Sequence, residues 1–75
     1  MMKINDTTMM RLNLTKLMHE QKFSPSTRTE ITHHIANCEV NIGNKIVSEI
    51  ITMINNKTTE KEIRKTMIEK YKMKI

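Results

Sequence analysis

The chain has 75 residues and a formal net charge of +5, with one glycine, one proline, one cysteine and no tryptophan. This length allows a single domain, and the scarcity of glycine and proline leaves few tight turns, which favours an all-α fold. No apolar run is long enough to span a bilayer, and the N-terminus lacks the apolar centre of a signal peptide. A single cysteine excludes an intrachain disulfide framework and fits a reducing compartment. We therefore expect a cytoplasmic protein with an aliphatic and methionine-rich core.

The first segment is expected to be a short helix behind a loose end. Residues 1–6 are polar and predict a flexible N-terminus, and four methionines among the first ten residues leave the true start uncertain. A helix is expected over residues 7–19, because apolar residues recur there in steps of three and four. Apolar residues also alternate within residues 10–14, as in a half-buried strand. A short strand over that stretch therefore remains the alternative.

The longest element is expected to be one helix over residues 25–55. Ser24 can cap this helix and Pro25 suits its first turn. No later proline interrupts it, and apolar residues recur along one face in steps of three or four. The residues of this line are Ile31, Ile35, Cys38, Ile42, Ile46 and Ile50.

A second apolar line beside the first widens the stripe toward the C-terminal half of this helix. A helix of about 30 residues would be about 45 Å long, and one apolar over much of its circumference must be covered from more than one side. Two short flanking segments cannot cover such a rod, so we expect an obligate homodimer whose core is the line of six residues. Gly43 either marks a close helix crossing or is merely tolerated, with a kink, inside the helix.

The last segment is expected to be a third helix over residues 60–73. Consecutive asparagines at positions 55 and 56 favour a turn before it. Thr59 and Glu62 have the spacing of a capping box, and apolar residues then recur in steps of four from Ile63.

The positive charge is concentrated at the two ends of the chain. Residues 57–75 carry seven basic and three acidic side chains, and residues 1–25 carry four basic and two acidic ones. Residues 26–56, in contrast, carry two basic and three acidic side chains. Basic ends that flank a nearly neutral rod favour a polyanion partner, although charged residues also simply solvate a helix surface.

The order of a short, a long and a short helix resembles that of the minimal histones of archaeal type. Lys22-Phe23-Ser24 before the long helix, Arg28 just inside it, Lys57-Thr58 before the third helix and Glu62-Ile63 within it are similar to residues of that family. The resemblance implies a handshake homodimer whose paired loops bind the phosphates of double-stranded DNA. It implies a nucleoid-associated protein that compacts DNA without sequence preference. The expected DNA contacts are Arg11, Lys16, Lys22, Ser24, Arg28, Lys57 and Thr58.

Few residues indicate other chemistry. His34 and Cys38 lie four apart, which is a possible spacing for two metal ligands, but a buried structural cysteine is the expectation and no metal site is predicted. His33 and His34 are expected at the surface or at the dimer edge, with pH sensing as the alternative. The chain lacks a glycine-rich phosphate loop and a nucleophile with its base, so we expect neither an enzyme nor a cofactor.

Two other functions remain open from the sequence. One is a small helical regulator or inhibitor, of viral or mobile-element type, that engages another protein through its apolar stripe. The other is a ribbon-helix-helix repressor, in which residues 10–14 would form the strand that reads the major groove. Against this second alternative, Leu12 would be an apolar residue at a base-reading position.

Overall fold

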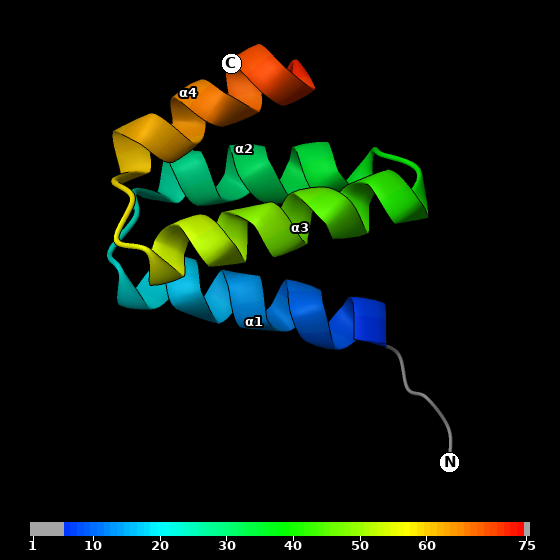
Figure 1. The fold of residues 1–75 in the computed structure, drawn as a ribbon, viewed down its shortest axis with the longest axis horizontal. Helices are drawn as coiled ribbons and strands as arrows, with labels where there is room; N and C mark the ends of the chain where they lie inside the picture. Colours follow the sequence, from blue (N-terminus) through cyan, green and yellow to red (C-terminus); the bar gives the residue numbers. More distant parts are fainter. Residues whose placement is uncertain (1–5, 75) are drawn as a thin grey trace.

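The computed structural model describes residues 6–74, and the side chains of residues 9–74. Within this range the chain forms four helices and no strand: α1 (Asp6–Glu20), α2 (Pro25–Ala36), α3 (Val40–Asn55) and α4 (Glu60–Tyr71). Successive helices run in opposite directions along the long axis of the molecule (Figure 1). The all-α prediction is confirmed, and so are the first and last helices to within two residues. The prediction of a flexible N-terminus falls, except for Asp6, outside the described residues.

The single helix expected over residues 25–55 is wrong, because the chain breaks it after Ala36. Asn37 closes α2, and its backbone N–H donates to carbonyls of the last turn. Glu39 has an extended backbone and caps α3, since its carboxylate accepts hydrogen bonds from the N–H groups of Asn41 and Ile42 at 3.1 and 3.3 Å. The chain therefore reverses direction where an unbroken rod was expected. The three-helix order implied by the histone resemblance requires that rod, and the described chain has two helices in its place.

The strand considered for residues 10–14 is also absent, since these residues lie in the middle of α1. Helical spacing prevails there because Leu14 and Met18, four residues apart, are both buried against the rest of the chain. A ribbon-helix-helix fold needs that strand, so the structure speaks against this alternative.

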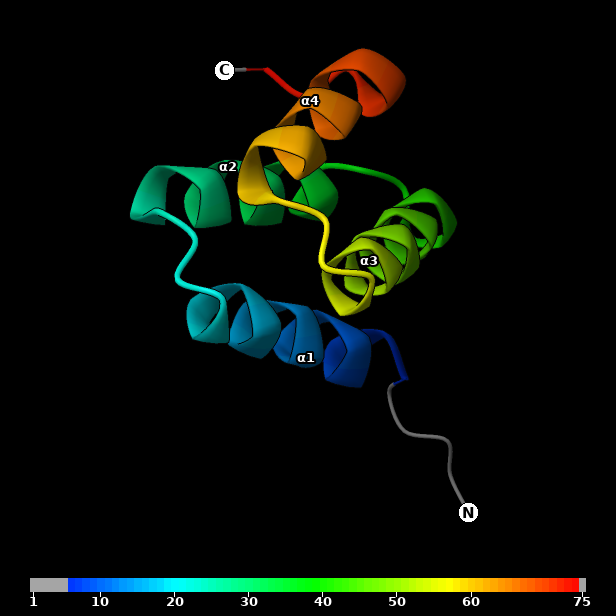
Figure 2. The same ribbon diagram turned by 60° about the vertical axis from the view of Figure 1, so that its left-hand side comes forward.

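The core lies among α1, α2 and α3, with α3 packed chiefly against α1 and also against α2. Figure 2 shows α1 on one side of α2 and α3, and α4 on the other. The buried hydrophobic side chains of the described residues come from all four helices, from the α1–α2 connection and from the segment after α4. They are Leu14, Met18, Phe23, Ile31, Ile35, Ile46, Val47, Ile50, Ile54, Ile63, Met67 and Met73.

Four of the six residues expected in a dimer core are buried within one chain: Ile31, Ile35, Ile46 and Ile50. Cys38 is half-buried in the break between α2 and α3, and Ile42 is 51% exposed. The premise that one chain cannot cover the stripe is wrong, because α2 and α3 fold back and cover each other. The homodimer itself stays a prediction, since the burial of these four side chains does not depend on a second copy of the chain.

Three of the described helices are followed by a lysine with a left-handed backbone. Lys22, Lys57 and Lys72 have φ values of 60°, 67° and 59° and follow α1, α3 and α4. After α1 and α3, the next N–H donates to a carbonyl five residues back, from Phe23 to Met18 at 3.0 Å and from Thr58 to Met53 at 2.9 Å. This is the Schellman arrangement, which usually carries glycine at the left-handed position.

Candidate nucleic-acid interface

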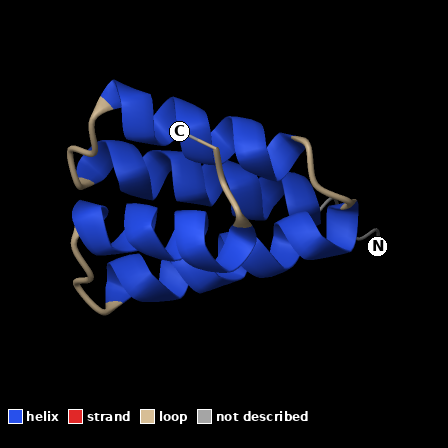
Figure 3. Cartoon of the chain, turned by 90° about the horizontal axis from the view of Figure 1, so that it is seen from above, coloured by secondary structure: helices blue, strands red, loops and turns tan. Residues whose placement is uncertain are grey.

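The connections α1–α2 (residues 21–24) and α3–α4 (residues 56–59) meet at one end of the molecule. Figure 3 shows both there, with the α2–α3 connection at the opposite end. Hydrogen bonds join the α1–α2 connection to the first residue of α4, because Ser24 donates from its Oγ to a Glu60 carboxylate oxygen at 2.9 Å and from its N–H to the same carboxylate at 3.2 and 3.3 Å. In a handshake, loop one of one chain lies beside loop two of its partner. Here the two loops are neighbours within one chain.

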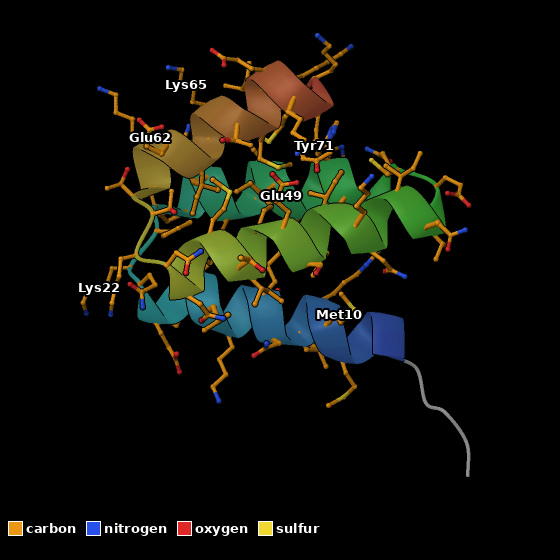
Figure 4. The ribbon with its side chains drawn as sticks, in the orientation of Figure 1. Met10, Lys22, Glu49, Glu62, Lys65 and Tyr71 are labelled. Carbon is orange, nitrogen blue, oxygen red and sulfur yellow. The ribbon has the colours of Figure 1, made fainter. Side chains whose placement is uncertain are left out.

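Each of these two loops exposes one of the left-handed lysines. Lys22 and Lys57 are both exposed, and Figure 4 shows Lys22 projecting from this end of the bundle. A left-handed backbone costs an L-residue roughly 1–2 kcal/mol, a penalty that glycine does not carry. A lysine at a helix C-terminus also interacts favourably with the helix dipole, by about 0.3–1 kcal/mol at an exposed site.

Ser24 and Arg28, both expected to bind DNA, are occupied within the chain. The Ser24 Oγ accepts from the N–H of Thr27 at 3.4 Å and so caps α2 as predicted. Arg28 donates from Nε to the carbonyl of Phe23 at 3.3 Å, and its Nη1 lies 3.3 Å from Nδ1 of His19. These bonds hold the α1–α2 connection in place. The two side chains thus shape the loop rather than present free donors.

The remaining expected contacts divide between surface and interior. Lys16 is exposed on α1, whereas Arg11 faces α3 and has a buried Nε. Thr58 is half-buried, and its N–H is used in closing α3. The structure therefore brings together Lys22, Ser24, Arg28, Lys57 and Thr58 at the loops and leaves Arg11 and Lys16 on a different part of the molecule.

Two exposed lysines of α4 extend the basic loops, and sequence reasoning missed them. Lys61 and Lys65 are four residues apart, so they share one face of the helix. Figure 4 shows Lys65 pointing away from the bundle, with Glu62 nearby on the same helix. The four-residue spacing of Lys61 and Lys65 was the feature of the sequence that could have identified them as neighbours on one helix face. We name Lys22, Lys57, Lys61 and Lys65 the loop surface.

Beneath the loop surface, Glu60 joins α4 to α2. The Thr27 hydroxyl donates to its carboxylate at 2.5 Å, and Arg64 donates from Nη1 to Thr27 Oγ1 at 2.9 Å and to Glu30 at 2.5 Å. The hydrogen bond from Thr27 lowers the pKa of Glu60, aided by Ser24 and by the charge of Arg64 and opposed by burial. Glu60 thus stays ionised, and its negative charge reduces the net potential of the loop surface.

Of the two residues that suggested a metal pair, His34 contacts the opposite end of α4 and Cys38 bonds to the backbone of α2. Nε2 of His34 lies 2.9 Å from the carbonyl of Tyr71, and the Cys38 thiol donates to the carbonyl of His34 at 3.3 Å. In the part of the chain that the structure describes, no three His, Cys, Asp or Glu side chains are grouped as metal ligands. None of the described helices combines the length and hydropathy needed to cross a membrane.

Comparison with known proteins identifies no relative. No protein-family model, no curated protein and no solved structure matches the chain.

Proposed function

We propose that this protein binds the phosphate backbone of double-stranded DNA, without sequence preference, through the loop surface. The observation that carries the proposal is the pair Lys22 and Lys57. Both occupy left-handed positions, where glycine avoids the steric penalty, and both project from neighbouring loops of one chain. Residues kept in unfavourable backbone conformations cluster at functional sites.

The recognition would be electrostatic. Lysine is a flexible point charge that meets phosphate oxygens from many directions, and such contacts carry no sequence information. The four side chains of the loop surface are all lysines, and the exposed amides beside them are Gln21 in one loop and Asn56 in the other. Affinity should therefore fall steeply with salt and change little between duplexes of different sequence.

DNA compaction, as the histone resemblance implies, would need a second loop surface, because one chain presents its four lysines at one end. A homodimer would supply this second surface. Val40 and Ile42, both more than half exposed in the first turn of α3, are the apolar side chains available for such an interface near the opposite end of the bundle. Sedimentation of the free protein and of its DNA complex tests this part of the proposal separately.

The decisive experiment replaces lysine by glycine at the left-handed positions. In Lys22→Gly/Lys57→Gly the charge is removed while the backbone conformation is eased, so the variant should stay folded. The slope of log affinity against log salt should become shallower by about 0.9 for each phosphate that is no longer neutralised, or about 1.8 for the pair. Gel-shift titrations with two unrelated duplexes at several salt concentrations provide the measurement.

Lys72→Gly is the matched control, since Lys72 has the same charge and nearly the same φ but follows the other end of α4. Its salt slope should differ from that of the unmodified protein by less than about 0.9, the effect of one phosphate. If the change in slope per lysine removed is the same for Lys72→Gly and for the double variant, net charge alone drives binding and the loop surface is rejected.

A protein-interaction module is the second candidate, because Met9 and Leu12 are 61% and 60% exposed on α1. Absence of DNA binding even at low salt would favour it. Substituting Leu12 by a polar residue should leave DNA binding unchanged if the loop surface is the functional one.

A further inference from the structure

An arginine occupies a core position between α1 and α3. Arg11, Leu14 and Met18 are spaced by three and four residues, so they form one line on α1. Leu14 and Met18 are buried, and the line meets α3, where Gly43 and Val47 are buried. At the position where the pattern calls for an apolar pair, the chain places a guanidinium opposite a glycine.

Gly43 makes room for this guanidinium. A Cβ atom at Gly43 would lie 2.6 Å from Nη2 of Arg11 and 3.3 Å from the carbonyl oxygen of Ile35. The close approach expected for this glycine is therefore present, but it is made within one chain, by a side chain and by the backbone of α2. Any larger residue would push Arg11 out of its position.

The arginine borders a partly enclosed cavity of about 70 Å³. The lining is mostly apolar, from Leu14, Ile35 and Val47, with Thr15 and Thr32 also contributing. The volume exceeds the roughly 30 Å³ that one water molecule occupies in the liquid, so a group of several atoms fits.

One nitrogen of the guanidinium is buried without an acceptor. Nε of Arg11 is buried without a hydrogen-bond partner, and within the described residues no ion pair involves Arg11. Arg11 as a whole is half-buried, and removing even part of a guanidinium from water carries a cost that a bound anion offsets. The cavity therefore has a guanidinium nitrogen without an acceptor at one wall, and the rest of its lining is mostly apolar.

We propose that this cavity binds a short-chain aliphatic carboxylate, with the carboxylate on Arg11 and the alkyl group against Leu14, Ile35 and Val47. A guanidinium pairs with a carboxylate through two parallel hydrogen bonds, and the apolar walls favour an alkyl tail over a fully hydrated anion such as phosphate. The site is separate from the loop surface and does not depend on the proposed DNA binding.

Thermal unfolding of the whole chain tests the site with sodium butyrate, sodium phosphate and sodium chloride at equal ionic strength. At ten times its dissociation constant, butyrate should raise the melting temperature by roughly 5–10 °C, while chloride leaves it unchanged. A response to butyrate no larger than that to chloride would overturn the proposal. A larger response to phosphate would overturn the choice of an aliphatic carboxylate.

Substitutions test whether the response to butyrate arises from binding at Arg11. Arg11→Gln and Arg11→Leu should both abolish the butyrate shift, and Arg11→Leu should fold at least as stably because leucine suits the apolar lining. Gly43→Ala should weaken the response by displacing the guanidinium, whereas Lys16→Gln, which removes an exposed charge of the same helix, should keep it. Methyl signals of Ile35 and Val47 in NMR spectra should move with butyrate in the unmodified chain and in Lys16→Gln, but not in the two Arg11 variants. Retention of the shift in both Arg11 variants would place butyrate elsewhere and refute the site.

Discussion

Helix α4 shares the apolar core of α1, α2 and α3, but polar bonds also attach it at both ends. Helices α1, α2 and α3 bury a continuous set of aliphatic and methionine side chains against one another. Helix α4 buries Ile63 and Met67, and polar bonds fix both of its ends. At its start Glu60 and Arg64 bind Ser24, Thr27 and Glu30, as described above.

At the other end of α4, Lys70 and Tyr71 both donate to Glu49 of α3, the lysine at 3.0 Å. The hydrogen bond from Tyr71 lowers the pKa of Glu49, with further help from Lys70 and opposition from burial. Burial, and then Glu49, raise the pKa of Tyr71. Apolar burial supplies most of the stability and is not directional, whereas these bonds specify where α4 lies. The two regions should therefore respond differently to mutation and to acid.

The largest effect should come from a charge placed in the three-helix core. Ile46 is fully buried, so Ile46→Asp leaves an unpaired buried carboxylate and should unfold a domain of ordinary marginal stability. Ile42→Asp, four residues earlier, should change the free energy of unfolding by less than about 1 kcal/mol, because that side chain is half exposed. Circular dichroism with urea titration measures both. A severe loss of stability in Ile42→Asp would reveal an interaction outside the single chain and would support the homodimer.

An intermediate loss of stability is expected when the hydrogen bonds that attach α4 to α2 are broken. Thr27 is 1% exposed and bonds both Glu60 and Arg64. Thr27→Val should lower the free energy of unfolding by about 1–3 kcal/mol, because it leaves two charged groups short of a partner. Thr32→Val, at an exposed position of the same helix, should stay within about 0.5 kcal/mol. Equal stability of the two variants in chemical denaturation would show that α4 is held by apolar packing alone.

Acid should loosen α4 before the core. Glu49 and Glu60 have lowered pKa values in the folded chain, so their stabilisation is full above about pH 4.3, the ordinary glutamate pKa, and is lost as pH falls below it. The hydrogen-exchange protection factors of α4 should fall at a higher pH than those of α3. Glu60→Gln should remove part of this pH dependence, while Glu62→Gln, an exposed change in the same turn, should keep it. If α3 and α4 lose their protection from hydrogen exchange together at every acidic pH, the two regions do not differ in their response to acid.

The smallest expected effect is a gain in the free energy of unfolding. Lys22→Gly, Lys57→Gly and Lys72→Gly each relieve a left-handed backbone, and this relief is partly cancelled by the greater freedom of unfolded glycine and by the missing dipole interaction. We expect each to raise the free energy of unfolding by no more than about 1 kcal/mol, as a small rise in melting temperature. A consistent decrease would mean that the lysine side chains contribute more to folding than to surface charge.

The sequence determined the helical class and most helix ends. Ser24 with Pro25, and Thr59 three residues before Glu62, are local signals, and both act as caps in the structure. Local signals can be recognised in a sequence because their partners lie within a few residues. The turn before α4 was also predicted, although the left-handed residue is Lys57 and not an asparagine.

Only the tertiary structure decided where the chain reverses and which polar groups meet. No glycine or proline marks the break after Ala36, and the apolar spacing continues through it, because Ile35 and Ile46 face the same core from two helices. The direction of the half-buried Arg11 side chain, which points at Gly43 of α3, depends on packing between segments that are about thirty residues apart. The meeting of Ser24 and Glu60 likewise follows from the chain reversal, which brings α2 and α4 together after the local signals have acted.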